Sequence, residues 1–324
     1  MKALLCTQYG PPEALTLQTI ADPQPGPGEV VVQMKAAGVN FPDVLIIQNK
    51  YQFKPQLPFA PGAEFSGVIS AVGSGVRSRK VGDKVIGSVT FGAFAEQVCL
   101  PAERTIAMPE GLDFETAAAL VLTYGTSWHA LVDRAQLQAG ETLLVLGASG
   151  GVGLAAIQIG RALGARVIAA ASSAEKLAVC QQNGAHALID YGREDLRERL
   201  KSLTEGRGPN VIYDPVGGPL TEVSFRSIAW RGRHLVVGFA QGDIPKLPLN
   251  LALLKGASLI GVFWGQYLQL EPAAFAADLK ELFERVAAGE LKPYISARYP
   301  LADGARALRE LMDRRASGKL VIVP

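Results

Sequence analysis

The sequence predicts an α/β protein that combines a doubly wound parallel sheet with a partly open β-barrel domain. Short β-branched runs separated by glycine and proline turns occupy the N-terminal third, and from Leu143 onward apolar strands alternate with amphipathic helices. Alternation of this kind indicates a parallel sheet covered by helices on both faces. The length of 324 residues fits about two domains.

The N-terminal part is expected to be β-rich. The segment Ala21–Gly28 is a connector rich in proline and glycine, which cannot form a helix because proline lacks the amide proton. Four β-branched runs follow, at Glu29–Met34, Glu64–Val72, Lys84–Ser88 and Ala95–Leu100. Strands without intervening helices predict the barrel.

The remainder predicts helices and strands in alternation. Strands are expected at Leu143–Leu146, Arg166–Ala171, Ala187–Asp190, Asn210–Tyr213, His234–Gly238, Ser258–Val262 and Lys319–Val323. Helices are expected at Asp113–Tyr124, Thr126–Arg134, Val152–Leu163, Ala174–Asn183, Glu194–Leu203, Pro272–Ala288 and Asp303–Ala316. We therefore predict one domain from residues 1–122 and 264–324, and a second from residues 123–263.

Composition excludes several classes of function. The formal net charge of +2 gives no electrostatic reason to expect nucleic acid or membrane binding, and no long apolar run predicts a membrane span. The N-terminus does not resemble a signal peptide. Cys6, Cys99 and Cys180 are too sparse for a disulfide framework, so a cytoplasmic location is expected.

The strongest local motif follows the strand Leu143–Leu146. The spacing Ala148-x-Gly150-x-x-Gly153 is a dinucleotide fingerprint with alanine in its first position. Gly150 allows the backbone to approach a pyrophosphate, and Gly153 allows the helix to pack against the strand. Exposed amide groups and the helix dipole then favour a diphosphate.

The end of the next strand predicts the form of the cofactor. An acidic residue about twenty positions after the fingerprint would bind the ribose 2′-hydroxyl of NAD, but this chain has Ser172 and Ser173 there, followed by Lys176. Hydroxyls and a cation suit the 2′-phosphate of NADPH. Ser172-x-x-Glu175 also has the form of a helix capping box, and both interpretations can hold together.

Four motifs together resemble the medium-chain dehydrogenase/reductase superfamily, over essentially the whole chain. Besides the fingerprint they are Ala37–Asp43, Pro61–Gly67 and Val81–Val85. The resemblance implies a Rossmann domain and a GroES-like barrel domain. Zinc alcohol dehydrogenases of that superfamily have cysteine where this chain has Asn40 and histidine where it has Ala63, beside the retained Glu64, and their structural zinc lobe has no counterpart here. We therefore expect no metal.

The pattern is similar to the zinc-free quinone oxidoreductase branch, the zeta-crystallin-like reductases. Asn40–Asp43, Tyr51 and Asp214–Gly218 match motifs of that branch. Without a Lewis acid, the acceptor must be reactive by itself, which quinones and α,β-unsaturated carbonyls are. The protein then has to align the nicotinamide with the acceptor and stabilise the developing oxyanion.

The resemblance also assigns candidate residues. It implies that Asn40, Tyr51 and Thr126 lie at the nicotinamide end, with Asn40 as an amide donor and Tyr51 as an oxyanion or proton donor. Structural alternatives are a turn role for Asn40, packing for Tyr51 and a helix N-cap for Thr126. Besides these three residues, which would also contact the cofactor, the resemblance implies cofactor roles for Ser149, Gly150, Gly151, Val152, Ser172, Lys176, Tyr191, Gly238, Phe239, Ala240, Phe263 and Trp264. The fingerprint and the strand end add Gly153 and Ser173, and core packing is the alternative for Phe263 and Trp264.

Minor candidates have structural interpretations. We expect Asp43 to be a helix-cap or salt-bridge residue, His129 a packing residue and His186 a surface residue.

Three functions remain compatible with the sequence. They are reduction of a quinone by NADPH, reduction of the carbon–carbon double bond of an enone, enal or enoyl thioester, and a non-catalytic NADPH-binding structural role. A homodimer is also expected, because the strand Ser258–Val262 should form an unprotected apolar edge of the parallel sheet.

Overall fold

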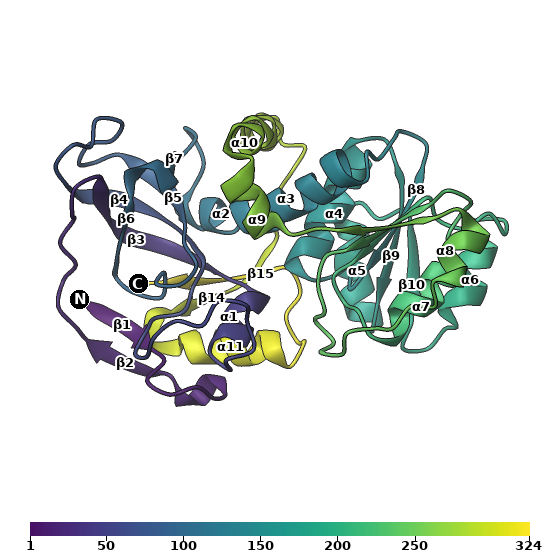
Figure 1. The fold of residues 1–324 in the computed structure, drawn as a ribbon, viewed down its shortest axis with the longest axis horizontal. Coiled ribbons are helices and arrows are strands. Elements are labelled where there is room, and N and C mark those ends of the chain that lie inside the picture. The colour runs from purple at the N-terminus through teal and green to yellow at the C-terminus, as the bar shows by residue number, and fades with distance from the viewer. The chain divides into compact units, whose positions relative to one another are not determined.

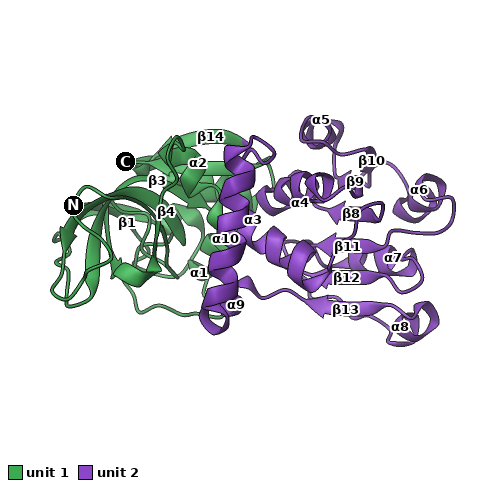
Figure 2. Ribbon diagram, turned by 90° about the horizontal axis from the view of Figure 1, so that it is seen from above, with its two compact units in different colours: residues 1–122, 295–324 green, residues 123–294 purple.

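The computed structural model describes residues 1–324, which divide into two compact units. Unit 1 comprises residues 1–122 and 295–324, and unit 2 comprises residues 123–294 (Figure 2). The first boundary is the one predicted from the sequence. The second differs, because residues 264–294 pack within unit 2 rather than unit 1.

Unit 1 is built on a seven-stranded sheet (Figure 1). Six of its strands follow the order β14-β15-β3-β4-β5-β7, and the seventh, β6, pairs with β3. These strands are β3 (Glu29–Val39), β4 (Glu64–Val72), β5 (Lys84–Ser88), β6 (Gln97–Pro101), β7 (Thr105–Ala107), β14 (Ile295–Pro300) and β15 (Lys319–Val323). A separate hairpin contains β1 (Lys2–Leu5) and β2 (Thr16–Thr19). The last strand returns to the first domain as predicted, whereas β14 was not foreseen.

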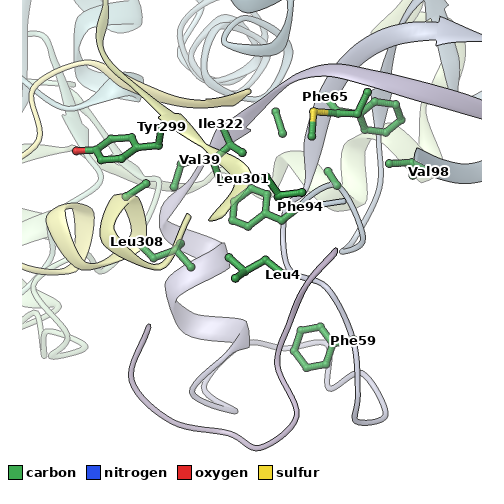
Figure 3. Packing of buried hydrophobic residues seen from close by; sticks show 14 of the residues in the cluster. Leu4, Val39, Phe59, Phe65, Phe94, Val98, Tyr299, Leu301, Leu308 and Ile322 are labelled. Atoms are coloured by element: carbon green, nitrogen blue, oxygen red, sulfur yellow. The ribbon is translucent and has the colours of Figure 1, made fainter. Parts of the chain in front are cut away.

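The core of unit 1 draws on both ends of the chain. Figure 3 shows Leu4 from the N-terminal strand beside Phe94, Leu308 and Ile322. The helices are α1 (Phe41–Ile46), α2 (Phe114–Ala118) and α11 (Gly304–Met312), with short 3₁₀ turns at Pro12–Ala14, Ala102–Arg104 and Leu301–Asp303. Joining the C-terminal segment to this core places Lys319, the first residue of β15, next to the end of β3.

Unit 2 contains the predicted parallel sheet, with six strands in the order β10-β9-β8-β11-β12-β13. The strands are β8 (Thr142–Leu146), β9 (Arg166–Ala171), β10 (Ala187–Asp190), β11 (Val211–Asp214), β12 (Arg233–Val236) and β13 (Ser258–Gly261). The order reverses between β8 and β11, which is the switch point where doubly wound sheets bind their ligands. The predicted edge position of β13 is confirmed.

Helices cover both faces of this sheet, which explains the continuous apolar character of its strands. Leu144 and Leu146 of β8 pack in a cluster with residues of α6 and α7, and Leu143 lies against Gly160 of α4. The helices of unit 2 are α3 (Val121–Trp128), α4 (Gly151–Ala162), α5 (Ala174–Gln182), α6 (Leu196–Leu203), α7 (Pro219–Arg226), α8 (Asn250–Lys255), α9 (Trp264–Leu270) and α10 (Pro272–Ala287), with a π-helical turn η3 (His129–Arg134) after α3.

Two predicted helices differ from the structure. The segment expected as one helix, Asp113–Tyr124, breaks after α2, where Ala119 and Leu120 separate it from α3. The second expected helix is the π-helical continuation of α3, so Thr126 lies inside a helix and is not an N-cap.

Residues 264–294 join unit 2 through specific contacts. The Tyr267 ring stacks on His129 with centroids 4.0 Å apart, and the Arg285 guanidinium lies 5.3 Å from the centre of the Trp128 ring. The backbone amide of Lys292 donates to Gln158 Oε1 at 2.7 Å. Sequence periodicity does not reveal these long-range contacts. No helix of the chain has the length and apolar character needed to cross a membrane.

Candidate functional site

The glycine turn after β8 has the geometry of an anion-binding helix start. Gly150 is the N-cap of α4 and provides no side-chain cap, so the first amide groups of this helix have no intrahelical acceptor. A Cβ on Gly153 would lie 2.6 Å from the Ala148 carbonyl oxygen, so packing alone requires glycine there. A Cβ on Gly150 would meet no protein atom closer than the Gly147 carbonyl oxygen at 3.5 Å. Packing within the protein therefore does not require glycine at position 150.

The end of β9 brings the predicted hydroxyls and cation together. Lys176 Nζ donates to Ser172 Oγ at 3.2 Å. The helix cap differs from the predicted box: Ser173, not Ser172, is the N-cap of α5, and its Oγ accepts from the Lys176 backbone amide at 3.4 Å. The Ser172 hydroxyl is therefore not used as the cap and stays with the ammonium. Tyr191, at the end of the neighbouring β10, donates its backbone amide to Ala171.

Asp214, at the end of β11, organises the loop that follows the switch point. Its Oδ1 accepts from the backbone amides of Val216 and Gly217 at 2.9 Å, and its Oδ2 accepts from Thr221 Oγ1 at 2.6 Å and lies 3.2 Å from His234 Nε2. Burial alone would raise the pKa of Asp214, but the hydrogen bonds from His234, Thr221 and Gly217 lower it. The carboxylate is thus held ionised under the loop.

The remaining predicted cofactor residues of unit 2 follow β12 and β13. Gly238, Phe239 and Ala240 follow β12, and the Phe239 side chain is partly exposed. Phe263, which follows β13, is also exposed, whereas Trp264 is buried and its indole nitrogen has no hydrogen-bond partner. All the predicted cofactor residues of this sheet therefore lie at or just after carboxyl ends of its parallel strands, where such sheets bind ligands.

Thr126 lies in the middle of α3 with a buried side chain, and no hydrogen bond engages its hydroxyl. One turn later, His129 Nδ1 lies 3.0 Å from Asp133 Oδ2, but the angle at this contact does not make a hydrogen bond. Burial lowers the pKa of His129, so the ring is neutral at neutral pH and acts as the packing residue predicted. His186 is exposed, as expected.

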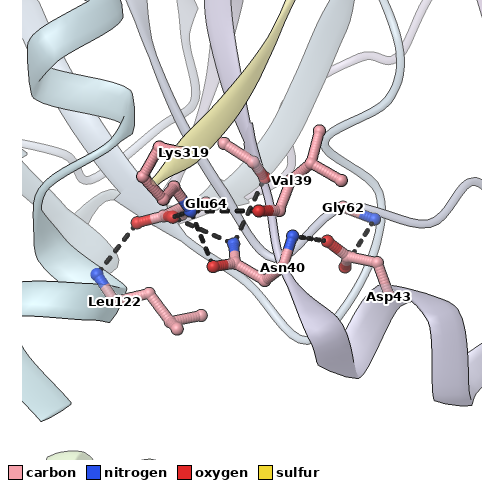
Figure 4. A network of polar contacts seen from close by, with 8 residues as sticks. Val39, Asn40, Asp43, Gly62, Glu64, Leu122 and Lys319 are labelled. Carbon is pink, nitrogen blue, oxygen red and sulfur yellow. Dashed lines mark hydrogen bonds and ion pairs between the residues drawn. The ribbon is translucent and has the colours of Figure 1, made fainter. Parts of the chain in front are cut away.

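In unit 1 Asn40 belongs to a buried polar network (Figure 4). Its Nδ2 donates to Glu64 Oε1 at 2.9 Å and to the Gly38 carbonyl at 3.2 Å. Its Oδ1 accepts from Lys319 Nζ at 2.7 Å. Both amide protons are used within the protein, so in this structure the Asn40 amide is not free to act as the donor that the sequence predicted.

Lys319 is the member of this network that sequence reasoning missed. Its Nζ donates to Glu64 Oε1 at 2.7 Å and to the Val39 carbonyl at 3.1 Å. Strand pairing brings the three segments together, since Leu320 pairs with Val39 and Glu64 pairs with Gly38. The signal in the sequence was a lysine at the start of an otherwise apolar strand.

This donor set does not fit zinc. Asn40 and Ala63 supply no thiolate or imidazole, and the retained carboxylate, Glu64, binds an ammonium instead. The other carboxylate oxygen, Glu64 Oε2, accepts from the Leu122 backbone amide at 2.9 Å. A divalent cation here would have to displace a buried lysine.

Asp43 and Tyr51 complete the predicted residues of unit 1. Asp43 caps α1 as expected, because Oδ2 accepts from the Asn40 amide at 2.8 Å, while Oδ1 accepts from the Gly62 amide at 3.2 Å. Burial raises the pKa of Asp43 to about 7. Burial, and then the Asp43 charge, raise the pKa of Tyr51, whose hydroxyl makes no hydrogen bond within the protein. The phenol therefore stays protonated and is free to donate.

Comparison with known proteins shows the class to which these two units belong. Residues 26–110 match the family model for the alcohol dehydrogenase GroES-like domain, and residues 151–285 match that for zinc-binding dehydrogenases. Quinone oxidoreductase-like protein 2 of Mus musculus is 40% identical over 99% of this chain and 91% of its own length. A quinone oxidoreductase of Pseudomonas aeruginosa is 37% identical, covering 100% of this chain and 99% of its own.

A solved structure gives the same result. The crystal structure of Escherichia coli quinone oxidoreductase complexed with NADPH superposes with a TM-score of 0.93 at 31% identity and covers 100% of both chains. The two folds are those of the medium-chain dehydrogenase/reductases. Within that superfamily, the chain belongs to the quinone oxidoreductase family of oxidoreductase enzymes.

Proposed function

We propose that this protein is an NADPH-dependent reductase that transfers a hydride to a quinone without a metal or a flavin. The observation that carries this proposal is that the Asn40, Glu64 and Lys319 network offers no thiolate or imidazole ligand for zinc, in a chain with an intact dinucleotide turn. The Escherichia coli quinone oxidoreductase complexed with NADPH, which shares both folds, supports the choice of cofactor.

Unit 2 supplies the cofactor-binding groups. The amides at the start of α4, with Ser149, Gly150, Gly151, Val152 and Gly153, would hold the pyrophosphate. Ser172, Ser173, Lys176 and Tyr191 would hold the 2′-phosphate end, because the Ser172 hydroxyl and the Lys176 ammonium already lie within 3.2 Å of each other. Gly238, Phe239, Ala240, Phe263 and Trp264 would contact the nicotinamide side. When bound, NADPH supplies the hydride.

The remaining task of the protein is to orient the acceptor and stabilise negative charge on its oxygen. We assign Asn40, Tyr51 and Thr126 to the nicotinamide end. Tyr51 and Thr126 have hydroxyls that no protein group engages, so each can donate to a ligand. Asn40 is held in place by the network, and both protons of its side-chain amide are donated to protein acceptors, so it offers no proton to a ligand.

The acceptor follows from the lack of a Lewis acid. A simple ketone needs polarisation, whereas hydride addition to a quinone or a conjugated carbonyl gives a delocalised anion. The relatives named quinone oxidoreductases favour the quinone.

One assay tests the proposal. The protein is mixed with NADPH, and oxidation of the reduced nicotinamide is followed by absorbance with a naphthoquinone, with an enone and with no acceptor. Quinone-dependent oxidation that Tyr51→Phe slows about tenfold or more is expected. If NADPH is oxidised with the enone but not with the naphthoquinone, the substrate is a conjugated alkene and not a quinone. Tight NADPH binding without oxidation by any acceptor would identify a non-catalytic binding protein.

We also propose that the protein is a cytoplasmic homodimer that pairs through β13. This strand is an edge of the parallel sheet. Helix α8, which precedes β13 in the sequence, exposes Leu253 and Leu254, and Leu249 at its N-cap is also exposed; these three leucines are 80%, 68% and 81% accessible. A symmetric second copy would pair the free edge and cover these leucines. The cytoplasmic assignment rests on three cysteines that are all unpaired.

A further inference from the structure

The hydroxyl of Ser127, on α3, links three elements of unit 2. The side chain is fully buried, and its Oγ donates to the Val152 carbonyl of α4 at 2.9 Å and lies 2.9 Å from the Tyr213 hydroxyl of β11. A carbonyl only accepts, so the single proton of Ser127 goes to Val152 and the Tyr213 hydroxyl donates to Ser127. A serine inside a helix commonly bonds to a carbonyl of its own helix or faces solvent. Ser127 instead connects α3 to another helix and to the parallel sheet.

A second hydrogen bond links the same two helices. The hydroxyl of Tyr124, three residues before Ser127, donates to Gln158 Oε1 of α4 at 2.8 Å, and the Tyr124 side chain is also buried. Residues three apart lie on one face of a helix, so this face of α3 is turned toward α4. One hydrogen bond would leave α3 free to rotate about it, whereas two bonds fix both its position and its rotation relative to α4.

The two residues before Ser127 contribute to the proposed nicotinamide end. Thr126 has a buried hydroxyl that no protein group engages. Gly125 lies against the indole of Trp264, because a Cβ on this glycine would be 2.9 Å from Trp264 Nε1. Successive residues of a helix are turned by about 100°, so these three neighbours face different sides of α3. A shift or rotation of α3 would therefore move the Thr126 hydroxyl and the surface beneath Trp264 together.

We propose that Ser127 is a positioning residue that sets the distance between the pyrophosphate turn and the nicotinamide end of the cofactor site. This inference rests on the proposed function, which places Val152 at the pyrophosphate and Thr126 and Trp264 at the nicotinamide. Val152 belongs to the first turn of α4, so the Ser127 hydrogen bond joins the two ends directly. Because its own proton is used within the protein, Ser127 acts through Thr126 and Trp264, and alignment of the nicotinamide depends on where they are held.

The test compares two ligands of the full-length protein. They are NADPH and 2′-phospho-ADP-ribose, which carries the pyrophosphate and the 2′-phosphate but no nicotinamide. By calorimetric titration, Ser127→Ala should raise the Kd for NADPH about fivefold or more, while the Kd for 2′-phospho-ADP-ribose stays within about twofold. Equal weakening of both ligands would show that Ser127 only supports the first turn of α4 and would overturn the proposal, as would unchanged binding of both.

Ser224→Ala is the matched control. Ser224 is also fully buried in unit 2, but its hydroxyl donates within its own helix, to the Thr221 carbonyl at 3.0 Å. This variant should change neither Kd. Turnover gives a second measurement: kcat with a naphthoquinone at saturating NADPH should fall about tenfold or more in Ser127→Ala and stay within about twofold in Ser224→Ala. An unchanged kcat in Ser127→Ala would also overturn the positioning role.

A second variant covers the case in which Ser127→Ala does not fold. Tyr124→Phe removes only the hydrogen bond to Gln158 and should weaken NADPH about threefold without weakening 2′-phospho-ADP-ribose. Equal effects of this variant on the two ligands would again contradict the proposal. Failure of the proposed function is distinct, because the wild type would then bind NADPH but oxidise none of it with any acceptor, while the two Kd values would still decide the role of Ser127.

Discussion

At the scale of single residues, the buried charges of unit 1 are arranged around one cation. Asp43 and Glu64 are both buried, and Lys319 binds Glu64 directly, while Asp43 accepts only from backbone amides. Burial is the largest influence on Asp43 and raises its pKa to about 7, since two amide donors and a more distant ammonium do not offset it. Asp43 is thus the weakly compensated member of the group.

This imbalance predicts a pH effect on stability. A raised pKa in the folded state stabilises the protein fully below the unfolded pKa of about 4, and the contribution is lost as the pH rises to about 7. Asp43→Asn cannot titrate, so the Tm of the wild type minus the Tm of this variant should fall as the pH rises from about 4 to about 7 and then stay constant. Glu64, Lys319 and Tyr51 are unchanged in both proteins. A difference that grows with pH would contradict the assignment.

The role of a single residue could be predicted from the sequence only where its hydrogen-bond partner lies close to it along the chain. Asp43 was expected to cap a helix, and its acceptor role toward Asn40 spans three residues. The partners of Lys319 lie 255 and 279 residues away, so no pattern of spacing could pair them. For the same reason, the sequence suggested a free amide at Asn40, which the structure shows to be engaged.

At the scale of elements, the two glycines of the turn after β8 have separable roles. Gly153→Ala places a Cβ 2.6 Å from a backbone oxygen and should cost about 1–3 kcal/mol of stability through overpacking. Gly150→Ala meets nothing closer than 3.5 Å, so it should leave Tm nearly unchanged and weaken NADPH binding about tenfold or more. Unfolding curves and fluorescence titration with NADPH measure both. Unchanged affinity in Gly150→Ala would contradict the site.

The loop after β11 depends on the hydrogen bonds that the Asp214 carboxylate accepts. Asp214→Asn replaces one acceptor oxygen by a donor, which would face either the Val216 and Gly217 amides or the Thr221 hydroxyl and His234. We expect a loss of about 2–4 kcal/mol, measured by denaturant unfolding. The matched control Thr221→Val removes one hydrogen bond and should cost about 1 kcal/mol. Equal losses in the two variants would show that the carboxylate does not organise the loop.

The elements that the sequence predicted well are those whose pattern is local. The strands of unit 2 alternate with helices and end in glycine or polar turns, and β4, β5, β9, β10 and β15 have the predicted bounds. The prediction of one continuous helix at Asp113–Tyr124 was wrong, because the contact at the point of interruption involves a residue far away in the sequence. The Leu122 amide donates to Glu64, 58 residues earlier, and α3 begins at Val121. An alanine-rich segment carries no local sign of that contact.

At the scale of the whole chain, unit 1 is discontinuous and unit 2 is inserted within it. The return of the last strand was predictable from its β-branched composition. The extent of the insertion was not, because residues 264–294 are held in unit 2 by ring contacts to Trp128 and His129 that composition does not report. The cofactor residues predicted on the strands of unit 2 nevertheless fall at one edge of the parallel sheet, since parallel strands share their carboxyl ends.

Assembly is the property of the whole molecule that the exposed edge of unit 2 predicts. Sedimentation equilibrium at about 10 µM should give a mass of about twice 34.3 kDa for the wild type. Leu253→Glu puts a charge on a side chain that is 80% accessible and next to the free edge, so it should shift the mass to that of one chain.

Leu17→Glu, on strand β2 of unit 1, is the control and should remain dimeric. Both variants keep the residues assigned to NADPH and should bind it normally. A glutamate buried in an interface weakens association, which is why Leu253→Glu should separate the two copies. A monomeric wild type, or equal masses in the two variants, would show that the α8 leucines and the edge of β13 are not the interface.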